Sequence, residues 1–340
     1  MARRFGPVIP VIALLVAVLA VAVAAFTVLR NQSSAGSVEG SGEPASTSAP
    51  AVVTSKSPFT GRSAPTGQPV LAVKIDNVRP ARPQTGLDRA DLVYVEPVEG
   101  GLSRIMAIFS AGLPTRIGPV RSARESDLEL LAQYGRPGLV YSGANRTVQS
   151  AIGAASVVDL SQDRVPSAYH RTSAKAAPHN LLVDPRALLS HARGISAAAD
   201  IGFRFGARPS DSSDRGTPIK RKVVRYGAAS TTFTWSARRR QWDVTLDGRA
   251  ATSTDGVRLG AATVIVQNTE ITSSALHDVL GNATPYTHSV GSGTALVLRD
   301  GVAIPARWSR PSAGVGTTFT TTAGASLPFA VGQTWVVFAG

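Results

Sequence analysis

The sequence predicts a mixed α/β fold with layered sheets and helices, followed by a β-rich C-terminal domain or lobe. Signals for strands and helices alternate from about residue 70 to residue 205, which is typical of α/β folds. A polar stretch rich in Pro, Gly and Ser at 206–222 ends this alternation, and the signals beyond it are nearly all those of strands. At 340 residues the chain is long enough to bury a sizeable core.

Residues 1–30 are predicted to be a transmembrane anchor or a signal segment. Arg3 and Arg4 precede an uncharged run from Phe5 to Leu29, and at about 1.5 Å per residue this run can cross about 30 Å of hydrocarbon. The positive charges favour an N-terminus inside the cell and a folded part outside it. The small residues of AVAVAA are also compatible with signal-peptide cleavage. We therefore expect a single-pass protein of the cytoplasmic membrane with extracytoplasmic domains or, alternatively, a secreted protein.

The rest of the chain divides into three predicted segments. Residues 31–57 are rich in Ser, Gly, Pro and Ala, so we expect a flexible linker there. A mixed α/β domain follows at 58–208, and a β-rich domain at 209–340.

In the first domain the apolar runs VLAVKIDN (70–77), ADLVYVEPV (90–98), SRIMAIFSA (103–111) and PGLVYSGAN (137–145) predict strands. Helices are predicted after Ser126, Asn145 and Asp184, each of which is a favoured N-cap residue. Pro185 strengthens the third start because proline suits the first helical position.

In the second domain TTFTWSARRRQWDVTLDG (231–248) predicts a hairpin, and further strands are expected within 261–272, 294–308 and 333–340. The tip of the hairpin carries Arg238, Arg239 and Arg240 between Trp235 and Trp242. Such a tip is suited to contact with polyanions, lipid headgroups or sugars, although a solvated turn is the simpler interpretation.

The composition limits the chemistry. The formal net charge is +13, and an extracytoplasmic basic protein meets anionic lipids, phosphate-rich wall polymers or nucleic acid. Specific nucleic-acid recognition is not expected, because no known nucleic-acid-binding motif is present. The absence of cysteine excludes disulfides, thiolate metal sites, a cysteine nucleophile and a lipidated N-terminal cysteine.

An unusual concentration of guanidinium groups lies in EGGLSRIMAIFSAGLPTRIGPVRSAR (99–124). A helix predicted to begin near Ser126 would place its N-terminus beside Arg121 and Arg124, which would form a cradle for phosphate or carboxylate. Equally, these arginines are suited to pair with nearby carboxylates and to tie loops together. The arginines of the stretch are Arg104, Arg116, Arg121 and Arg124.

Polar side chains also gather where predicted strands end. Asp76 and Asn77 end one strand, and Glu96 and Glu99 end the next, which is where sites gather in open α/β sheets. The carboxylates suit a general acid/base pair, a hard-cation site or ion pairs with the arginines. His179 is the best candidate for proton transfer near neutral pH, and a His-Asn pair that only satisfies loop amides is the alternative.

Taken in combination, these motifs resemble the YerB-like family of bacterial envelope proteins. The resemblance is carried by VKIDNVRPARPQTGLDRADLVYVEPVEGGLSRIMAIFS, IGPVRSAR and APHNL, and by GSGTALVLRDGVAIPARWSR and GQTWVVFA near the C-terminus. It implies a mixed α/β fold with layered sheets and no established reaction. Many members are lipoproteins, so in this cysteine-free chain a transmembrane anchor would replace the lipid. The chain also departs from the family at YSGANR, where relatives tend to have a Gly-Gly-Ser-Pro stretch.

We therefore expect one polar site at the strand ends, without metal or cofactor. The leading hypothesis is a membrane-tethered envelope protein that binds an anionic or carbohydrate ligand, such as a wall glycopolymer. The rivals are a hydrolase or transferase acting on that material and a scaffold whose charges are all internally paired. The candidate catalytic residues are Glu96, Glu99 and His179, and the candidate ligand-binding residues are Asp76, Asn77, Arg104, Arg121, Ser122, Arg124, Arg171 and Asn180.

Overall fold

The structure is a computed structural model that describes residues 54–208, 215–278 and 281–340. These described residues pack as one compact unit. The predicted membrane anchor or signal segment at 1–30 and most of the predicted linker at 31–57 lie outside the described residues. None of the described helices is long and apolar enough to cross a membrane.

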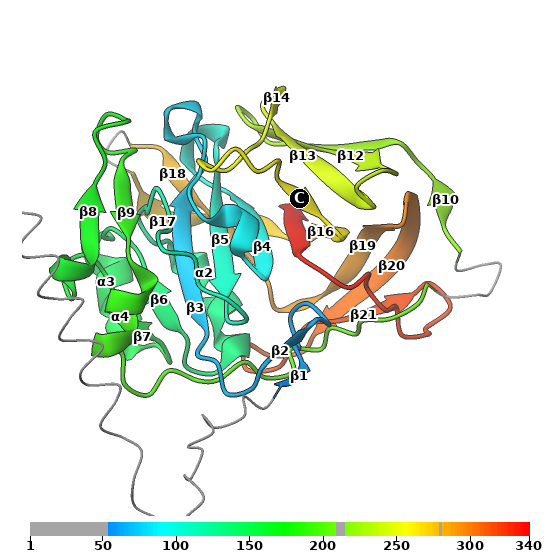
Figure 1. Cartoon of the computed structure of the whole chain (residues 1–340), viewed down its shortest axis with the longest axis horizontal. Helices are drawn as coiled ribbons and strands as arrows, with labels where there is room; N and C mark the ends of the chain where they lie inside the picture. Colours follow the sequence, from blue (N-terminus) through cyan, green and yellow to red (C-terminus); the bar gives the residue numbers. More distant parts are fainter. Residues whose placement is uncertain (1–53, 209–214, 279–280) are drawn as a thin grey trace, which may run out of the picture. The chain divides into compact units, whose positions relative to one another are not determined.

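The largest element is an 11-stranded mixed sheet that draws strands from both predicted domains (Figure 1). In spatial order its strands are β10 (Thr217–Pro218), β20 (Val302–Arg310), β19 (Gly291–Arg299), β16 (Thr263–Asn268), β22 (Thr334–Ala339), β4 (Leu92–Pro97), β5 (Ser103–Phe109), β3 (Leu71–Asp76), β6 (Gly138–Val140) and β7 (Val158–Asp159), with β21 (Thr318–Thr321) paired to β20.

The C-terminal strand β22 joins the two halves of this sheet. It pairs in parallel with β16 on one side and with β4 on the other, and in Figure 1 the red β22 lies beside the cyan β4. Trp335 is opposite Val264 in one ladder and Val93 in the other. The hydrogen bonds therefore run without a break across the predicted boundary near residue 208.

Smaller sheets accompany the large one. The predicted hairpin at 231–248 is confirmed as β12 (Ser230–Ser236) and β13 (Gln241–Leu246). It forms a 5-stranded sheet with β11 (Arg221–Arg225), β14 (Arg249–Ala250) and β15 (Gly260–Ala261). The two-stranded sheets are β1 (Thr54–Lys56) with β2 (Ser63–Pro65), β8 (Tyr169–Arg171) with β9 (Leu181–Val183), and β17 (Ile271–His277) with β18 (Ala283–Thr287). Strand β1 lies inside the predicted linker, so the folded body starts before residue 58.

Three α-helices match the predicted helical segments: α2 (Glu125–Leu131), α3 (Arg146–Ala154) and α4 (Pro185–His191). The caps of α3 and α4 are confirmed, because the side chain of Asn145 accepts from the Val148 amide and that of Asp184 from the first amides of α4. Helix α2 begins one residue before the predicted cap Ser126. Short 3-10 helices lie at η1 (Arg79–Ala81), η2 (Leu87–Arg89), η3 (Glu99–Gly101), η4 (Ala132–Tyr134) and η5 (Pro166–Ala168).

Strands dominate the mixed fold. Among the described residues strands and bridges hold 43% and helices 14%, so this part of the chain is strand-rich. The structure therefore fits the predicted mixed, β-rich fold, and the layered α/β description stays a prediction.

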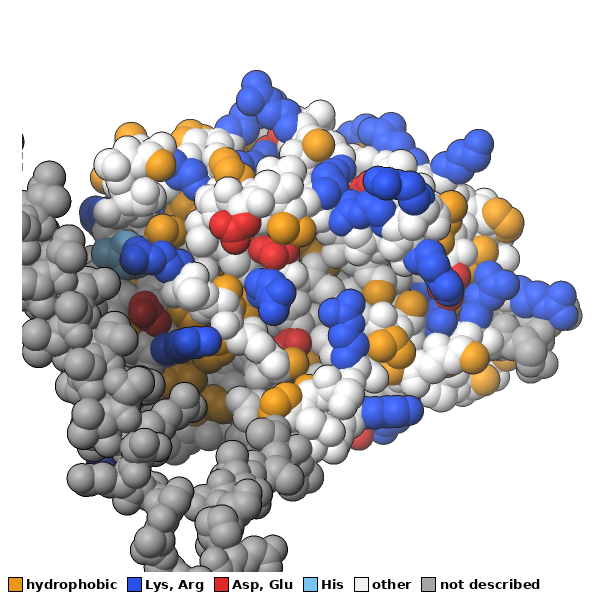
Figure 2. All heavy atoms as spheres, in the orientation of Figure 1, with side chains coloured by type: hydrophobic (Ala, Val, Ile, Leu, Met, Phe, Trp, Pro, Cys, Tyr) orange, Lys and Arg blue, Asp and Glu red, His pale blue; other side chains and the backbone are white. Residues whose placement is uncertain are grey.

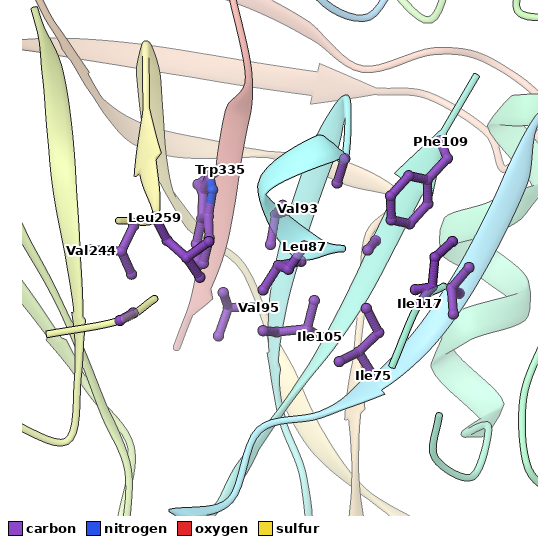
Figure 3. Close-up of a cluster of buried hydrophobic side chains, with 14 of the residues drawn as sticks. Ile75, Leu87, Val93, Val95, Ile105, Phe109, Ile117, Val244, Leu259 and Trp335 are labelled. Atoms are coloured by element: carbon purple, nitrogen blue, oxygen red, sulfur yellow. The ribbon is translucent and has the colours of Figure 1, made fainter. Parts of the chain in front are cut away.

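Both faces of the large sheet are buried. On one face Val73 and Ile75 pack with Val93 and Ile105. Beyond them Trp335 meets Val244 of β13 and Leu259, which directly precedes β15 (Figure 3). The other face carries Ala72, Tyr94 and Met106 and packs on α2, α3 and a cluster of phenylalanines. Because side chains alternate along a strand, Lys74 and Asp76 follow Ala72 onto this second face.

We predict that Trp335→Ala destabilises the whole folded unit by about 3–5 kcal/mol. Trp335 is fully buried, its ring lies 5.9 Å from that of Phe233, and its indole N–H donates to Gln333 Oε1 at 2.8 Å. Urea unfolding measures the loss, with Val331→Ala as the control because Val331 is 50% exposed. A loss below about 1 kcal/mol would contradict the joining role of β22.

Candidate functional site

The site begins with a row of charged side chains across three strands. Asp76 at the end of β3 is opposite Arg104 on β5, and Arg104 is in turn opposite Glu96 on β4. Residues directly opposite one another in a ladder share a face of the sheet. The strand ends therefore place these three charged residues on one face of the sheet, the face that α2 covers.

Lys74 lies two residues before Asp76 on the same face of β3 and holds Glu96 of this row in an ion pair. Its side chain is fully buried, and Nζ donates to Glu96 on β4 and, at 2.6 Å, to Asp127 Oδ1 on α2. Both carboxylates are also buried. A buried ammonium ion requires such partners, because leaving it unpaired in the interior costs several kcal/mol.

The buried environment strongly changes the pKa of Glu96. Burial raises the pKa of Glu96 to about 7, and the nearby positive charge of Lys74 only partly opposes the rise. Glu96 therefore changes its protonation near neutral pH inside the core.

Next to the row lies a pocket of about 570 Å³ at the ends of β3, β4 and β5. We call it the strand-end pocket and define it by six of the polar residues that line it. These residues are Asp76, Glu99, Arg104, Arg121, Arg124 and His179. Ser122 also lines it, so seven of the residues predicted for the site lie together.

On one side of the pocket the carboxylate of Asp76 contacts nitrogen atoms of both His179 and Arg121. Asp76 Oδ2 accepts from His179 Nδ1 at 2.8 Å and lies 3.2 Å from Arg121 Nε. The Asp76 side chain is only 2% exposed, whereas those of His179 and Arg121 are 21% and 26% exposed. The carboxylate therefore orients both groups and leaves part of each facing the pocket.

Arg124 and Glu99 form a second, bidentate pair. Arg124 Nε lies 2.6 Å from Glu99 Oε1 and Nη2 lies 2.8 Å from Oε2. Burial alone would raise the pKa of Glu99, but the hydrogen bonds from Arg124 and Thr284 outweigh it and hold that pKa below its usual range. Glu99 is therefore ionised and engaged, which makes it a poor general base.

Arg104 differs from the other two arginines. It forms no ion pair with a carboxylate among the described residues, and its Nη1 makes one long contact of 3.5 Å to the Ser122 carbonyl. Burial lowers the pKa of Arg104 to about 10; the positive charges of Arg124 and Arg121 add to this effect, and the negative charges of Glu99 and Asp76 partly oppose it. It is still protonated at neutral pH, so the pocket holds a cation that lacks a counterion of its own.

Four predicted site residues do not line the pocket. Glu96 is held by Lys74 inside the core, which removes it from the candidate catalytic residues. Asn77 is buried between Ser103 and Gln84. Arg171 Nη1 donates to Asn180 Oδ1 at 2.8 Å, and the Asn180 amide donates to the Thr172 carbonyl, so these two stabilise their own loop.

The predicted helix cradle is also corrected. Helix α2 has 7 residues, and its first turn carries Glu125 and Asp127. Asp127 Oδ2 accepts from the Arg124 amide at 2.7 Å, so a carboxylate already occupies the positive end of the helix. The arginine side chains, rather than the helix N-terminus, give this pocket its basic character.

Sequence reasoning missed two parts of the site. The hairpin of β17 and β18 supplies Leu276, His277 and Thr284 to the pocket wall. No local signal indicates that contact, since it joins segments more than a hundred residues apart. Lys74 was overlooked although its signal is present, because a lysine inside an otherwise apolar strand needs buried partners.

The fold and the pocket define a strand-rich protein with a concave arginine site at the ends of its central strands. A family described as "Protein of unknown function (DUF3048)" matches through its N-terminal domain at residues 58–198 and its C-terminal domain at 222–336. The chain belongs to this YerB-like family, which confirms the resemblance drawn from the motifs.

A relative and a solved structure agree with this assignment. The "Putative lipoprotein YerB" of Bacillus subtilis (strain 168) is 26% identical over 304 residues, which are 83% of this chain and 85% of that protein. The crystal structure of YerB protein from Bacillus subtilis matches with a TM-score of 0.68 and 22% identity, covering 84% of this chain and 96% of that one. The structural match establishes a shared fold.

We predict that Glu96→Gln changes how stability depends on pH. The folded protein holds the Glu96 proton up to about pH 7, whereas an unfolded chain releases it near its ordinary value of 4.5. The wild type therefore loses stability as pH rises through this window, by up to about 3 kcal/mol, and the variant lacks that loss. Urea unfolding at several pH values tests this. A stability difference between the two proteins that stays constant with pH would contradict it.

Proposed function

We propose that this protein is a membrane-tethered cell-envelope protein that binds an anionic ligand in the strand-end pocket. A phosphorylated glycan and an anionic wall glycopolymer are the ligands that suit it best. The name of the Bacillus relative supports an envelope location, and the apolar run at 1–30 supplies an anchor in a chain that has no cysteine to carry a lipid.

The observation that carries the proposal is Arg104. Burial and two neighbouring arginines destabilise its charge, the more distant charges of Glu99 and Asp76 oppose this only in part, and no described carboxylate forms an ion pair with it. A bound anion would relieve this repulsion and use donors that Arg121 also presents to the pocket. A docking scaffold with every charge internally paired is less well supported for the same reason.

The apolar side chains of the strand-end pocket indicate which other chemical groups the ligand contains. Val98, Leu102 and Leu276 line the pocket beside the arginines. A volume of about 570 Å³ falls in the range of sites for small molecules or for one unit of a polymer. An anionic group attached to a less polar body, such as a sugar ring, therefore fits better than a bare inorganic ion.

We predict that Arg104→Gln weakens binding of a hexose phosphate by about tenfold or more, because it removes a charge-assisted contact. Calorimetric titration of the full chain in a non-ionic detergent measures this, and the affinity should also fall as salt is added. Arg171→Gln is the matched control, since Arg171 is exposed and does not line the pocket. Equal effects of the two substitutions, or no binding at all, would refute the anion site.

A hydrolase or transferase acting on the same material is the second candidate. It is favoured by the 2.8 Å contact of His179 with Asp76, which resembles the pairing of a catalytic base with the carboxylate that orients it. Arg104 would then stabilise negative charge that develops during the reaction.

If the protein is an enzyme, the wild type should release soluble fragments from wall glycopolymers and His179→Gln should lose that activity while keeping ligand affinity within about threefold. Chromatography of the reaction mixtures measures the release of these fragments. Saturable binding without any product would leave a binding protein.

A further inference from the structure

A second concavity lies at the other end of β4. Asp91, which directly precedes β4, lines a pocket of about 720 Å³. The 6 residues of β4 separate it from the strand-end pocket, which corresponds to about 20 Å of extended chain. We call it the basic pocket. The arginines that define it are Arg62, Arg89, Arg239, Arg240 and Arg299.

Two of these arginines belong to the framework of the fold. Arg299 is 4% exposed and donates to Asp300 and to the carbonyls of Pro328 and Gly206. Arg239 Nη1 donates to Asp243 Oδ1 at 2.8 Å. These contacts hold the walls in place, so a ligand is not needed to satisfy either group.

The other three arginines are differently placed. Arg62, Arg89 and Arg240 are exposed, and none of them forms an ion pair within the described part of the chain. Of the three aspartates that line the pocket, two are engaged elsewhere, and Oδ1 of the third, Asp88, is buried without a hydrogen-bond partner among the described residues. Asp91 accepts from two backbone amides at 2.6 and 3.0 Å, and Asp300 pairs with Arg299.

Arg240 has a backbone conformation that is unfavourable for residues with a bulky side chain. Its φ is 51°, in the left-handed region that Gly and Asn adopt most easily. An arginine at such a position is strained relative to asparagine, and strain of this kind concentrates at functional sites. The position therefore favours a role for the guanidinium beyond closing the hairpin.

Gly332 leaves space for the side chain of Arg62. Gly332 has a φ of 140°, and a side chain there would come within 3.1 Å of Arg62 Nη2. The glycine therefore lets the Arg62 guanidinium lie against the backbone that leads into β22. The β1–β2 segment and the β12–β13 hairpin, which are far apart in the sequence, thus bring arginines to one concavity.

From these contacts we infer that the basic pocket is a second binding site, which takes a soluble polyanion with closely spaced phosphate groups. Several guanidinium groups around one concavity suit adjacent phosphates better than a single anion. On the face drawn in Figure 2 basic side chains are more abundant than acidic ones, in line with the net positive charge of the chain.

A bilayer surface is a poorer occupant. The exposed large hydrophobic side chains among the described residues are Val257, Val315 and Val331, with no aromatic residue. Membrane-surface contacts normally add Trp, Phe or Leu to the basic groups. A concave site also admits a flexible polymer strand more readily than a flat layer of headgroups.

The test is a titration of tripolyphosphate into the full chain in a non-ionic detergent. All proteins carry Arg104→Gln, so that the strand-end pocket contributes little and the outcome is independent of the proposed function. The pocket variant adds Arg62→Gln, Arg89→Gln and Arg240→Asn. The control instead adds Arg221→Gln, Arg225→Gln and Arg238→Gln, which remove the same charge from exposed positions outside both pockets.

We expect the pocket variant to bind tripolyphosphate at least about tenfold more weakly, and the control to change by less than about threefold. Arg240→Asn suits the left-handed backbone, so the pocket variant should fold, which its melting temperature verifies. Equal losses in the two variants would mean that only overall charge matters, and would overturn the site. So would binding of the lipid headgroup glycerophosphoglycerol as tightly as tripolyphosphate, because that result would assign the pocket to a bilayer.

Discussion

The buried ion pairs of Lys74 hold together the parts on which this structure depends. One ammonium group on β3 joins a glutamate on β4 and an aspartate on α2. The backbone carbonyl of Lys74 accepts from the Arg121 amide at 2.8 Å, and Asp127 accepts from the Arg124 amide. The arginines of the strand-end pocket are therefore fixed through the same residue that ties the helix to the sheet. Removing one partner would leave a buried charge unpaired, which typically lowers the free energy of unfolding by about 3–5 kcal/mol.

The two pockets suit different parts of an anionic polymer. The strand-end pocket combines arginines with Leu102 and Leu276, which favours a unit with both an anionic group and a less polar body. The basic pocket is lined by arginines with few apolar neighbours, which favours repeated phosphates. Since β4 runs between them, one rigid strand sets their separation. A polymer engaged at both ends would gain affinity from the second contact without any further change in the fold.

Much of this arrangement follows from local sequence. The strands at 70–77, 90–98 and 103–111, and the caps Asn145 and Asp184, are readable from apolar runs and capping preferences. The site predicted from the strand ends, the arginine-rich stretch and His179 includes seven of the residues that line the pocket. Glu96 could not be excluded, because its partner Lys74 is shared with Asp127, which lies on a helix whose docking no local pattern reveals. The insertion of β22 between β16 and β4 likewise depends on long-range pairing rather than on propensity.

The central claim is that Arg104, Arg121 and Arg124 form one anion site at the strand ends. The most direct measurement follows the Nε–Hε NMR signals of these arginines while a hexose phosphate is added, with each signal assigned by substitution. The account predicts that all three shift together along one saturating curve, while the signal of Arg171 stays in place. Signals that do not move, or that drift without saturation together with every other arginine, would contradict it.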